Sequence, residues 1–177
     1  KDELAAVKEK FGDERRTRIE AASGEAEIED LIAEEDMVIT ISHAGYIKRL
    51  PVTTYRSQRR GGRGVTGAGT KEEDFIQHLF IASTHSYILV FTDKGRVHWL
   101  KVHELPLAGR TAKGKAVVNL VDMSQQERVA AVLPVKQFDN KQFILMCTQK
   151  GTVKKTPLDA YSNPRRGGIV AITVDAD

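Results

Sequence analysis

The sequence predicts an all-β protein assembled from a repeated strand unit. Three segments share one pattern: an apolar run, a Ser or Thr, two further residues, a Gly, and a second strand whose second residue is apolar. This pattern predicts a β-hairpin with a tight turn, in which the Gly takes a positive φ. The turn glycines recur 50 and 56 residues apart, a period typical of a propeller or another array of strand units. The predicted hairpins are 37–49, 87–99 and 143–155, with turn glycines Gly45, Gly95 and Gly151.

Each hairpin is followed by the same series of segments. Tyr55, Leu105 and Tyr161 each lie ten residues after the turn glycine, and a basic loop that contains glycine comes next. An apolar strand follows the loop, and a last strand completes the unit. The basic loops are 59–64, 110–115 and 165–168, the strands after the second and third loops are 116–120 and 169–172, and the last strands are 75–82 and 128–135. The third unit stops at 174–177, so we expect the array to be cut within a repeat.

The beginning of the chain predicts a short helix and a linker. Leu4, Val7 and Phe11 recur at the spacing of one helical face, and Gly12 follows as a natural C-terminal stop. A charged connector and a small, polar linker come next. The segment 28–32 is expected to be a short first strand.

The net charge of the chain changes sign after residue 36, close to the end of this predicted linker and strand. Residues 1–36 hold 6 Lys and Arg against 13 Asp and Glu, a net charge of −7, whereas residues 37–177 hold 21 against 11, a net charge of +10. The acidic beginning and the basic remainder indicate two functional segments. The basic part suits a polyanionic partner.

Composition is that of an ordinary globular protein. At 177 residues the chain can bury a core, and no apolar run approaches the roughly 18 residues of a membrane span. Cys147 is the single cysteine, which excludes an internal disulfide and fits a reducing cytoplasm. Because Cys147 lies in an apolar run, we expect it to be a buried core residue. No signal-peptide pattern begins the chain, and we expect a cytoplasmic protein without a membrane partner.

The segment 58–64 is the strongest functional signal in the sequence. Guanidinium groups form planar, permanently charged forks that fit phosphate oxygens, and glycines let the backbone N–H groups approach a polyanion closely. With no apolar residue to anchor it, the segment should be a surface loop that holds a nucleic-acid backbone without reading its sequence. A flexible, solvated basic loop is the alternative. The seven residues are Gln58, Arg59, Arg60, Gly61, Gly62, Arg63 and Gly64.

Other signals carry less weight. A Gly-x-Gly-x-x-Gly match at 62–67 has neither the helix nor the βαβ unit of a dinucleotide site around it. The five histidines lack metal-ligand spacing, and no catalytic triad motif occurs. Trp99 is expected in the core. Several cations flank the second hairpin strands, where each would ordinarily be solvated, although in an array they could widen a positive track: Lys48, Arg49, Lys101, Lys154 and Lys155.

These residues resemble one known family. The segment 58–64 is similar, without a mismatch, to the A-box of the DNA gyrase A subunit, which is part of a bacterial type IIA topoisomerase. The segment 11–17 is similar to the end of that family's breakage–reunion domain. The resemblance implies that 1–20 end that domain, that 21–36 are the linker and first strand, and that 37–177 are the first blades of a β-pinwheel. A β-pinwheel is a propeller-like disc of four-stranded blades with strands exchanged between neighbours, six blades in full and about three here.

The resemblance also implies a function. Such a domain wraps double-stranded DNA around its basic rim with a positive crossing, which supports ATP-dependent negative supercoiling. The catalytic tyrosine belongs to the upstream domain, so this part would be non-catalytic alone, and ATP and Mg²⁺ would act on other parts of an A₂B₂ heterotetramer with the gyrase B subunit. We would place it in the bacterial cytoplasm with the nucleoid. By repeat alignment, the rim residues of later blades are Arg110, Lys113, Lys115, Arg165 and Arg166.

Two alternatives stay open at this point. A topoisomerase IV A subunit has a similar pinwheel with a degenerate or absent box, and the intact box argues against it. A basic β-repeat scaffold for acidic proteins would favour exposed aromatic or apolar residues near the loops, where this chain has Arg, Lys and Gly.

Overall fold

The computed structural model describes residues 1–13, 16–17, 28–55, 74–124 and 126–174. The chain divides into two units, Lys1–Leu31 and Ile32–Asp177. Among the described residues, no helix is long and apolar enough to cross a membrane.

The first unit contains the predicted helix but not the predicted first strand. Helix α1 spans Asp2–Phe11, and none of its residues is buried. Gly12 ends the helix in an extended conformation, with a φ of −74°, so the helix stop does not use a left-handed glycine. The segment expected to be a strand forms instead a 3₁₀-helix, η1, over Ile28–Leu31. Ile28 and Leu31 are three residues apart, which matches the three residues per turn of a 3₁₀-helix. Asp30, by contrast, interrupts the alternation of apolar and polar residues that is typical of a strand.

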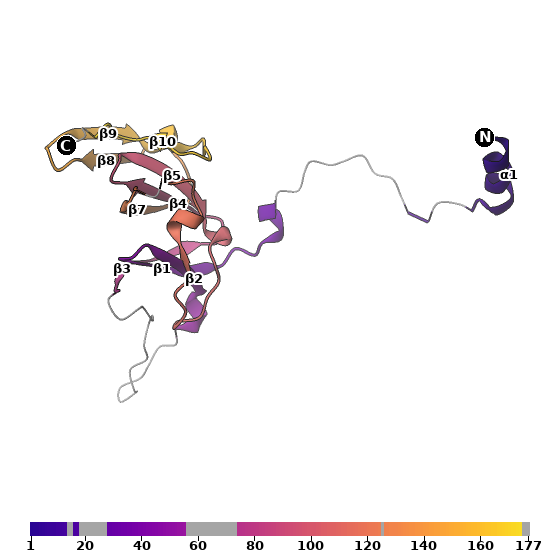
Figure 1. The fold of residues 1–177 in the computed structure, drawn as a ribbon, viewed down its shortest axis with the longest axis horizontal. Helices are drawn as coiled ribbons and strands as arrows, with labels where there is room; N and C mark the ends of the chain where they lie inside the picture. The colour runs from indigo at the N-terminus through magenta and orange to yellow at the C-terminus, as the bar shows by residue number, and fades with distance from the viewer. Residues whose placement is uncertain (14–15, 18–27, 56–73, 125, 175–177) are drawn as a thin grey trace, which may run out of the picture. The chain divides into compact units, whose positions relative to one another are not determined.

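The second unit contains the three predicted hairpins, all antiparallel. The turn glycines have φ angles of 80°, 72° and 87°, which confirms the tight turns predicted at these positions. In Figure 1 the hairpins follow one another through the second unit in chain order. They are formed by β1 (Asp36–Ser42) with β2 (Tyr46–Pro51), β4 (Tyr87–Thr92) with β5 (Arg96–Lys101), and β8 (Phe143–Cys147) with β9 (Val153–Pro157).

Two of the hairpins are extended to four-stranded sheets by strands from different repeats. The last strand of the same repeat pairs with the first hairpin strand, and a short strand from the next repeat pairs with the second. We call these sheets blade 1, with the order β3-β1-β2-β6, and blade 2, with the order β7-β4-β5-β10; the β8–β9 hairpin is blade 3. The added strands are β3 (Ile76–Ser83), β6 (Lys115–Ala116), β7 (Val129–Val135) and β10 (Ile169–Val170).

The exchanged strands are shorter than predicted. The residues expected to continue the strand after β6 form the 3₁₀-helix η4, Val117–Asn119. The reason is the length of the partner strand: Ala116 pairs with Tyr46, the first residue of β2, and the next N–H, of Val117, donates to the Gly45 carbonyl in the hairpin turn. Beyond Ala116 there is no strand left to pair with, so the chain turns away.

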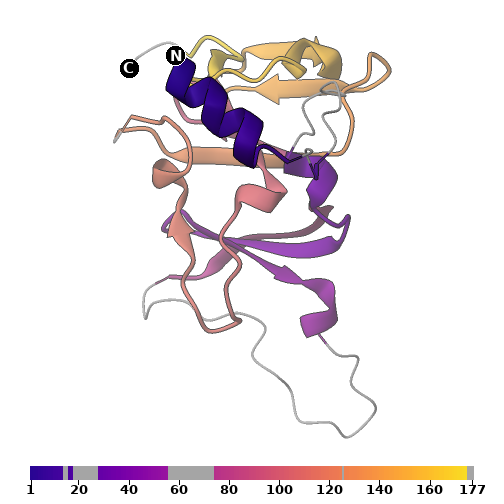
Figure 2. The same ribbon diagram turned by 90° about the vertical axis from the view of Figure 1, so that its right-hand side faces the viewer.

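The core lies between the blades. Figure 2 shows the three sheets stacked in chain order. Ile39 and Ile41 of blade 1 share one buried cluster with Ile88 and Val90 of blade 2. Blade 2 packs its other face against blade 3 in a second cluster, in which the half-buried Trp99 lies. Trp99 also donates its indole N–H to the Tyr161 carbonyl at 2.8 Å, and its predicted core position is confirmed.

Cys147 is exposed, so its predicted burial is wrong. Successive strand residues face opposite sides of a sheet. Ile144 and Met146 face the second cluster, whereas Phe143 and Leu145, on the same side as Cys147, are 51% and 69% exposed. Within the described part of the chain, no further sheet covers that side.

Candidate nucleic-acid interface

Four of the five predicted rim cations lie on the two segments that lead into the exchanged strands, and the fifth, Lys115, is the first residue of strand β6. We call residues 106–114 the first exchange loop, which connects η3 (Val102–Glu104) to β6, and residues 162–168 the second, which connects η5 (Leu158–Tyr161) to β10. Because β6 flanks β2 and β10 flanks β5, the loops occupy the same edge of successive blades. The structure therefore confirms the equivalence of the two loops that the repeat alignment predicts.

The five predicted rim cations are at least partly exposed to solvent. Arg110 is half-buried, and the other four are exposed: Lys113, Lys115, Arg165 and Arg166. No ion pair joins any of the five to another described residue. Cations without an acidic partner are available to an external anion. The box residues Gln58, Arg59, Arg60, Gly61, Gly62, Arg63 and Gly64 lie outside the described residues, and their role stays a prediction.

One glycine in each loop permits a close approach to the neighbouring strand. Gly114 has a φ of 84°, and a Cβ atom there would stand 2.2 Å from the Ile47 carbonyl oxygen of β2. Gly168 has a φ of 68°, and its Cβ would stand 2.7 Å from the Val97 carbonyl oxygen of β5. Real Cβ contacts are longer than both distances, so only glycine fits without a shift.

The first exchange loop is held from inside by Lys48. The side chain of this β2 residue is buried, with 2% exposed, and its ammonium donates to the carbonyl oxygens of Arg110 and Ala112, both at 2.6 Å, and of Gly109 at 3.3 Å. Burial lowers the pKa of Lys48. The three carbonyl dipoles favour the charged form and oppose that cost. Lys48 is thus bound within the protein and does not extend a solvated positive surface.

Arg49 holds the segment just before this loop. Its guanidinium donates to the Leu105 carbonyl oxygen at 2.8 Å and to that of His103 at 3.0 Å. Lys154 likewise donates to the Ala171 carbonyl at 2.6 Å. The pattern of the sequence predicts solvated side chains for these cations, but the structure directs them to backbone carbonyls that strand pairing leaves free.

The second exchange loop is held differently. Arg96 donates from the edge of β5 to the carbonyl oxygens of Gly167 and Gly168. The residue that corresponds to Lys48 is His98, which is 1% exposed and whose ring nitrogens have no hydrogen-bond partner among the described residues. Burial, with a smaller contribution from Arg96, lowers the pKa of His98, while Glu127 and Asp122 oppose the shift. Near neutral pH the imidazole is therefore uncharged.

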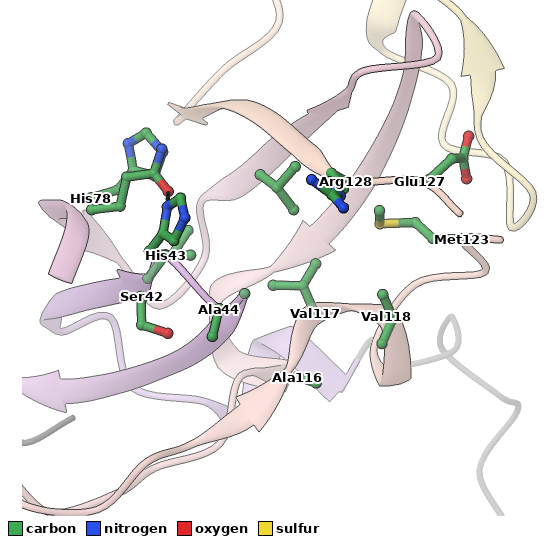
Figure 3. A pocket seen from close by; sticks show the side chains of 14 residues that line it. Ser42, His43, Ala44, His78, Ala116, Val117, Val118, Met123, Glu127 and Arg128 are labelled. Carbon is green, nitrogen blue, oxygen red and sulfur yellow. Dashed lines mark hydrogen bonds between the residues drawn. The ribbon is translucent and has the colours of Figure 1, made fainter. Parts of the chain in front are cut away.

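A cavity lies between blades 1 and 2 beside the first hairpin turn. Figure 3 shows His43 and His78 on one side of it and Met123 and Glu127 on the other. His43 stacks on Phe75, with ring centroids 4.8 Å apart, and shares a hydrogen bond with Gln77. The histidines and the Glu127 carboxylate do not converge on a common point. No cluster of three or more potential metal ligands occurs in the described ranges.

The comparisons with known proteins agree on one family. Its model, described as the DNA gyrase C-terminal domain, beta-propeller, matches residues 36–83, 86–136 and 142–177. The chain belongs to this family. It is 51% identical to the DNA gyrase A subunit of Clostridium acetobutylicum over 177 residues and 48% identical to that of Haemophilus influenzae over 174 residues. The two alignments include 100% and 98% of this chain. The chain spans only 21% and 20% of the length of those two proteins.

Solved structures agree with the β-pinwheel prediction. The C-terminal domain of DNA topoisomerase IV superposes with a TM-score of 0.69 at 28% identity, covering 82% of this chain and 44% of that one. A DNA gyrase A C-terminal domain superposes with a TM-score of 0.62 at 20% identity, covering 80% and 44%. The strand exchange between blades 1 and 2 is the feature that distinguishes a pinwheel from a simple row of hairpins.

Proposed function

We propose that this chain binds double-stranded DNA through its exchange loops and bends the duplex along the blade edge that carries them. The observation that supports this most directly is the repetition of exposed cations, without acidic partners among the described residues, on the same edge of successive blades. Cations spaced along an edge can follow a phosphate backbone. Bending DNA costs several kcal/mol, about 1–6 for a smooth bend, and many phosphate contacts must offset that cost.

Within the longer proteins to which the chain is similar, the same surface would wrap DNA with positive writhe. Strand passage by a type IIA topoisomerase would then give negative supercoils. In this proposal the chain is the non-catalytic, DNA-wrapping part of a gyrase A subunit that assembles with gyrase B as A₂B₂ in the bacterial cytoplasm. ATP and Mg²⁺ act on other parts of that assembly, and the chain itself needs no cofactor.

A second candidate is DNA binding without strong wrapping, as expected of a topoisomerase IV A subunit. It is favoured by the TM-score of 0.69 to a topoisomerase IV domain, against 0.62 to a gyrase domain. The intact 58–64 box and the identities of 51% and 48% to gyrase A subunits favour wrapping.

A nick-closure assay separates the two candidates. Nicked circular DNA is ligated with the protein, with its Arg59→Ala/Arg60→Ala/Arg63→Ala variant, and with an Arg165→Ala/Arg166→Ala variant, and the sign of the trapped supercoils is determined. Positive supercoils that decrease in both variants support wrapping along box and exchange loops. Binding that traps no supercoils supports the second candidate, and an absence of binding at low salt overturns both.

A further inference from the structure

Lys48 is an unusual residue for the interior of a sheet. Its ammonium is buried, it donates hydrogen bonds to three backbone carbonyls, and no ion pair with a carboxylate is found for it among the described residues. Burying a charge is costly unless the surrounding dipoles compensate. A residue that serves only to fill space between blades would be apolar, as Ile39 and Leu50 are.

The hydrogen bonds of Lys48 determine how the first exchange loop presents its two faces. The carbonyls of Gly109, Arg110 and Ala112 all point inward to one ammonium. Their negative ends are therefore turned away from the solvent side, where Lys113 is exposed. An anion that approaches the loop meets cationic side chains and not the carbonyl oxygens that would repel it.

Strand exchange does not itself require this lysine. The second exchange loop forms its strand next to His98, which makes no hydrogen bond to the loop within the described residues. There the loop carbonyls are held by Arg96 from the sheet edge. Of the two exchange loops that the structure describes, only the one that carries Arg110 and Lys113 is held by an internal cation.

We propose that Lys48 is a positioning residue of the nucleic-acid interface. It fixes the backbone of 109–112 so that Arg110 and Lys113 are preorganised for phosphates, and it does so without contacting DNA. This inference rests on the proposed function, because it concerns how one of the proposed DNA-binding loops is prepared. Preorganisation raises affinity by removing the cost of ordering the loop on binding.

The test is a double-mutant cycle between Lys48 and the loop. Lys48→Met keeps an unbranched side chain that is one atom shorter and removes the donors. Arg110→Ala/Lys113→Ala removes the proposed phosphate contacts. Affinity for a duplex of random sequence is measured by fluorescence anisotropy at several KCl concentrations. Each variant is expected to weaken binding about tenfold. The salt slope, which is the slope of log affinity against log salt concentration, should fall by up to about two in magnitude, about 0.9 for each lost phosphate contact. The combined variant should bind no more weakly than the loop variant alone.

Leu50→Ala is the matched control, because Leu50 lies on the same strand and is 1% exposed but holds no part of the loop. It should destabilise the fold without changing the salt slope. If Lys48→Met does not fold, Lys48→Gln, which retains amide donors, takes its place in the same cycle with a smaller expected loss. Far-UV circular dichroism establishes which variants are folded.

The outcomes separate the two proposals. If Arg110→Ala/Lys113→Ala leaves the affinity unchanged, the first exchange loop does not contact DNA. Both its place in the proposed DNA-binding surface and the positioning role of Lys48 are then wrong. If the loop variant weakens binding but the folded Lys48 variant does not, or if the two effects multiply, DNA binding stands and Lys48 has a structural role alone.

Discussion

The backbone carbonyls of the two exchange loops are bound by different cationic side chains. Each loop brings a strand from one repeat to the edge of the preceding blade, and each leaves carbonyl groups that strand pairing cannot satisfy. In the first loop a buried ammonium, that of Lys48, donates hydrogen bonds to three of them from within. In the second, the half-exposed Arg96 donates to two of them from the sheet edge, and the interior position holds the neutral His98.

The difference shows which features the fold itself requires. Both loops have a left-handed glycine pressed against a strand carbonyl, Gly114 and Gly168. By contrast, the cation that holds the loop varies in type and in location between the blades. We infer that the close glycine contact is a condition of strand exchange, whereas the holding cation adjusts the order and charge of each loop.

The largest effect on folding is expected from Gly114→Ala. A methyl group at Gly114 would combine a φ of 84° with an approach of 2.2 Å to the Ile47 carbonyl. Chemical denaturation should show a loss of about 3–4 kcal/mol in the free energy of unfolding. Gly45→Ala is the control: its φ is 80°, but no atom lies within 4 Å of the added Cβ, so about 1–2 kcal/mol is expected. Equal losses in the two variants would mean that close approach is not what the exchange loop requires.

Exchanging the two holding cations for methionine should give the next largest effect. Lys48→Met leaves the carbonyls of Gly109, Arg110 and Ala112 without their shared donor and should cost about 2–3 kcal/mol of unfolding free energy. Arg96→Met should cost less, about 1–2 kcal/mol. The Arg96 side chain is 38% exposed, so water can replace its bonds to the loop carbonyls, but the variant also removes the 3.9 Å ion pair with Glu127, whose side chain is 6% exposed. Urea denaturation of both variants gives the comparison. A larger loss for Arg96→Met would contradict the view that the internal cation is the stronger support.

His98 should make the second blade sensitive to acid. Its folded-state pKa is lowered, chiefly by burial, so the unfolded state binds the proton more readily. The stabilising contribution is complete above the unfolded pKa of about 6.5 and is lost as the pH falls toward the folded pKa. The free energy of unfolding should therefore decrease more between pH 7 and pH 5 in the parent protein than in His98→Leu. Parallel pH profiles for the two proteins would show that folding does not shift the pKa of this imidazole.

The sequence predicted the parts of this architecture that depend on local pattern. An apolar run, a turn glycine and a second strand are enough to place the three hairpins, because their hydrogen bonds join neighbouring segments. The length of the exchanged strands could not be predicted in this way. Ala116 stops pairing where β2 begins, at Tyr46, and that limit lies 70 residues away in the chain.

The burial of Lys48 has a signal in the neighbouring strand. Strand β1 has three consecutive apolar residues, Met37, Val38 and Ile39, whereas a strand buried on one face would alternate. A hairpin partner to such a strand is covered on both faces, so a lysine within it must find internal acceptors. The prediction for Cys147 failed for the opposite reason: its apolar surroundings predict a core residue, but exposure depends on whether another sheet covers that face.

The smallest effect on folding is expected from Arg165→Ala/Arg166→Ala in the second exchange loop. Both side chains are exposed and without an ion pair to a described residue, so the free energy of unfolding should change by less than about 0.5 kcal/mol. DNA affinity should nevertheless fall, and the salt slope should decrease by up to about two, because each phosphate contact contributes about 0.9. The groove beside these arginines also holds Glu104 and Asp122, which reduce the local positive potential. A smaller loss of affinity here than in Arg110→Ala/Lys113→Ala would therefore mean that the loop held by the internal cation is the stronger DNA contact, and a larger loss would reverse that order.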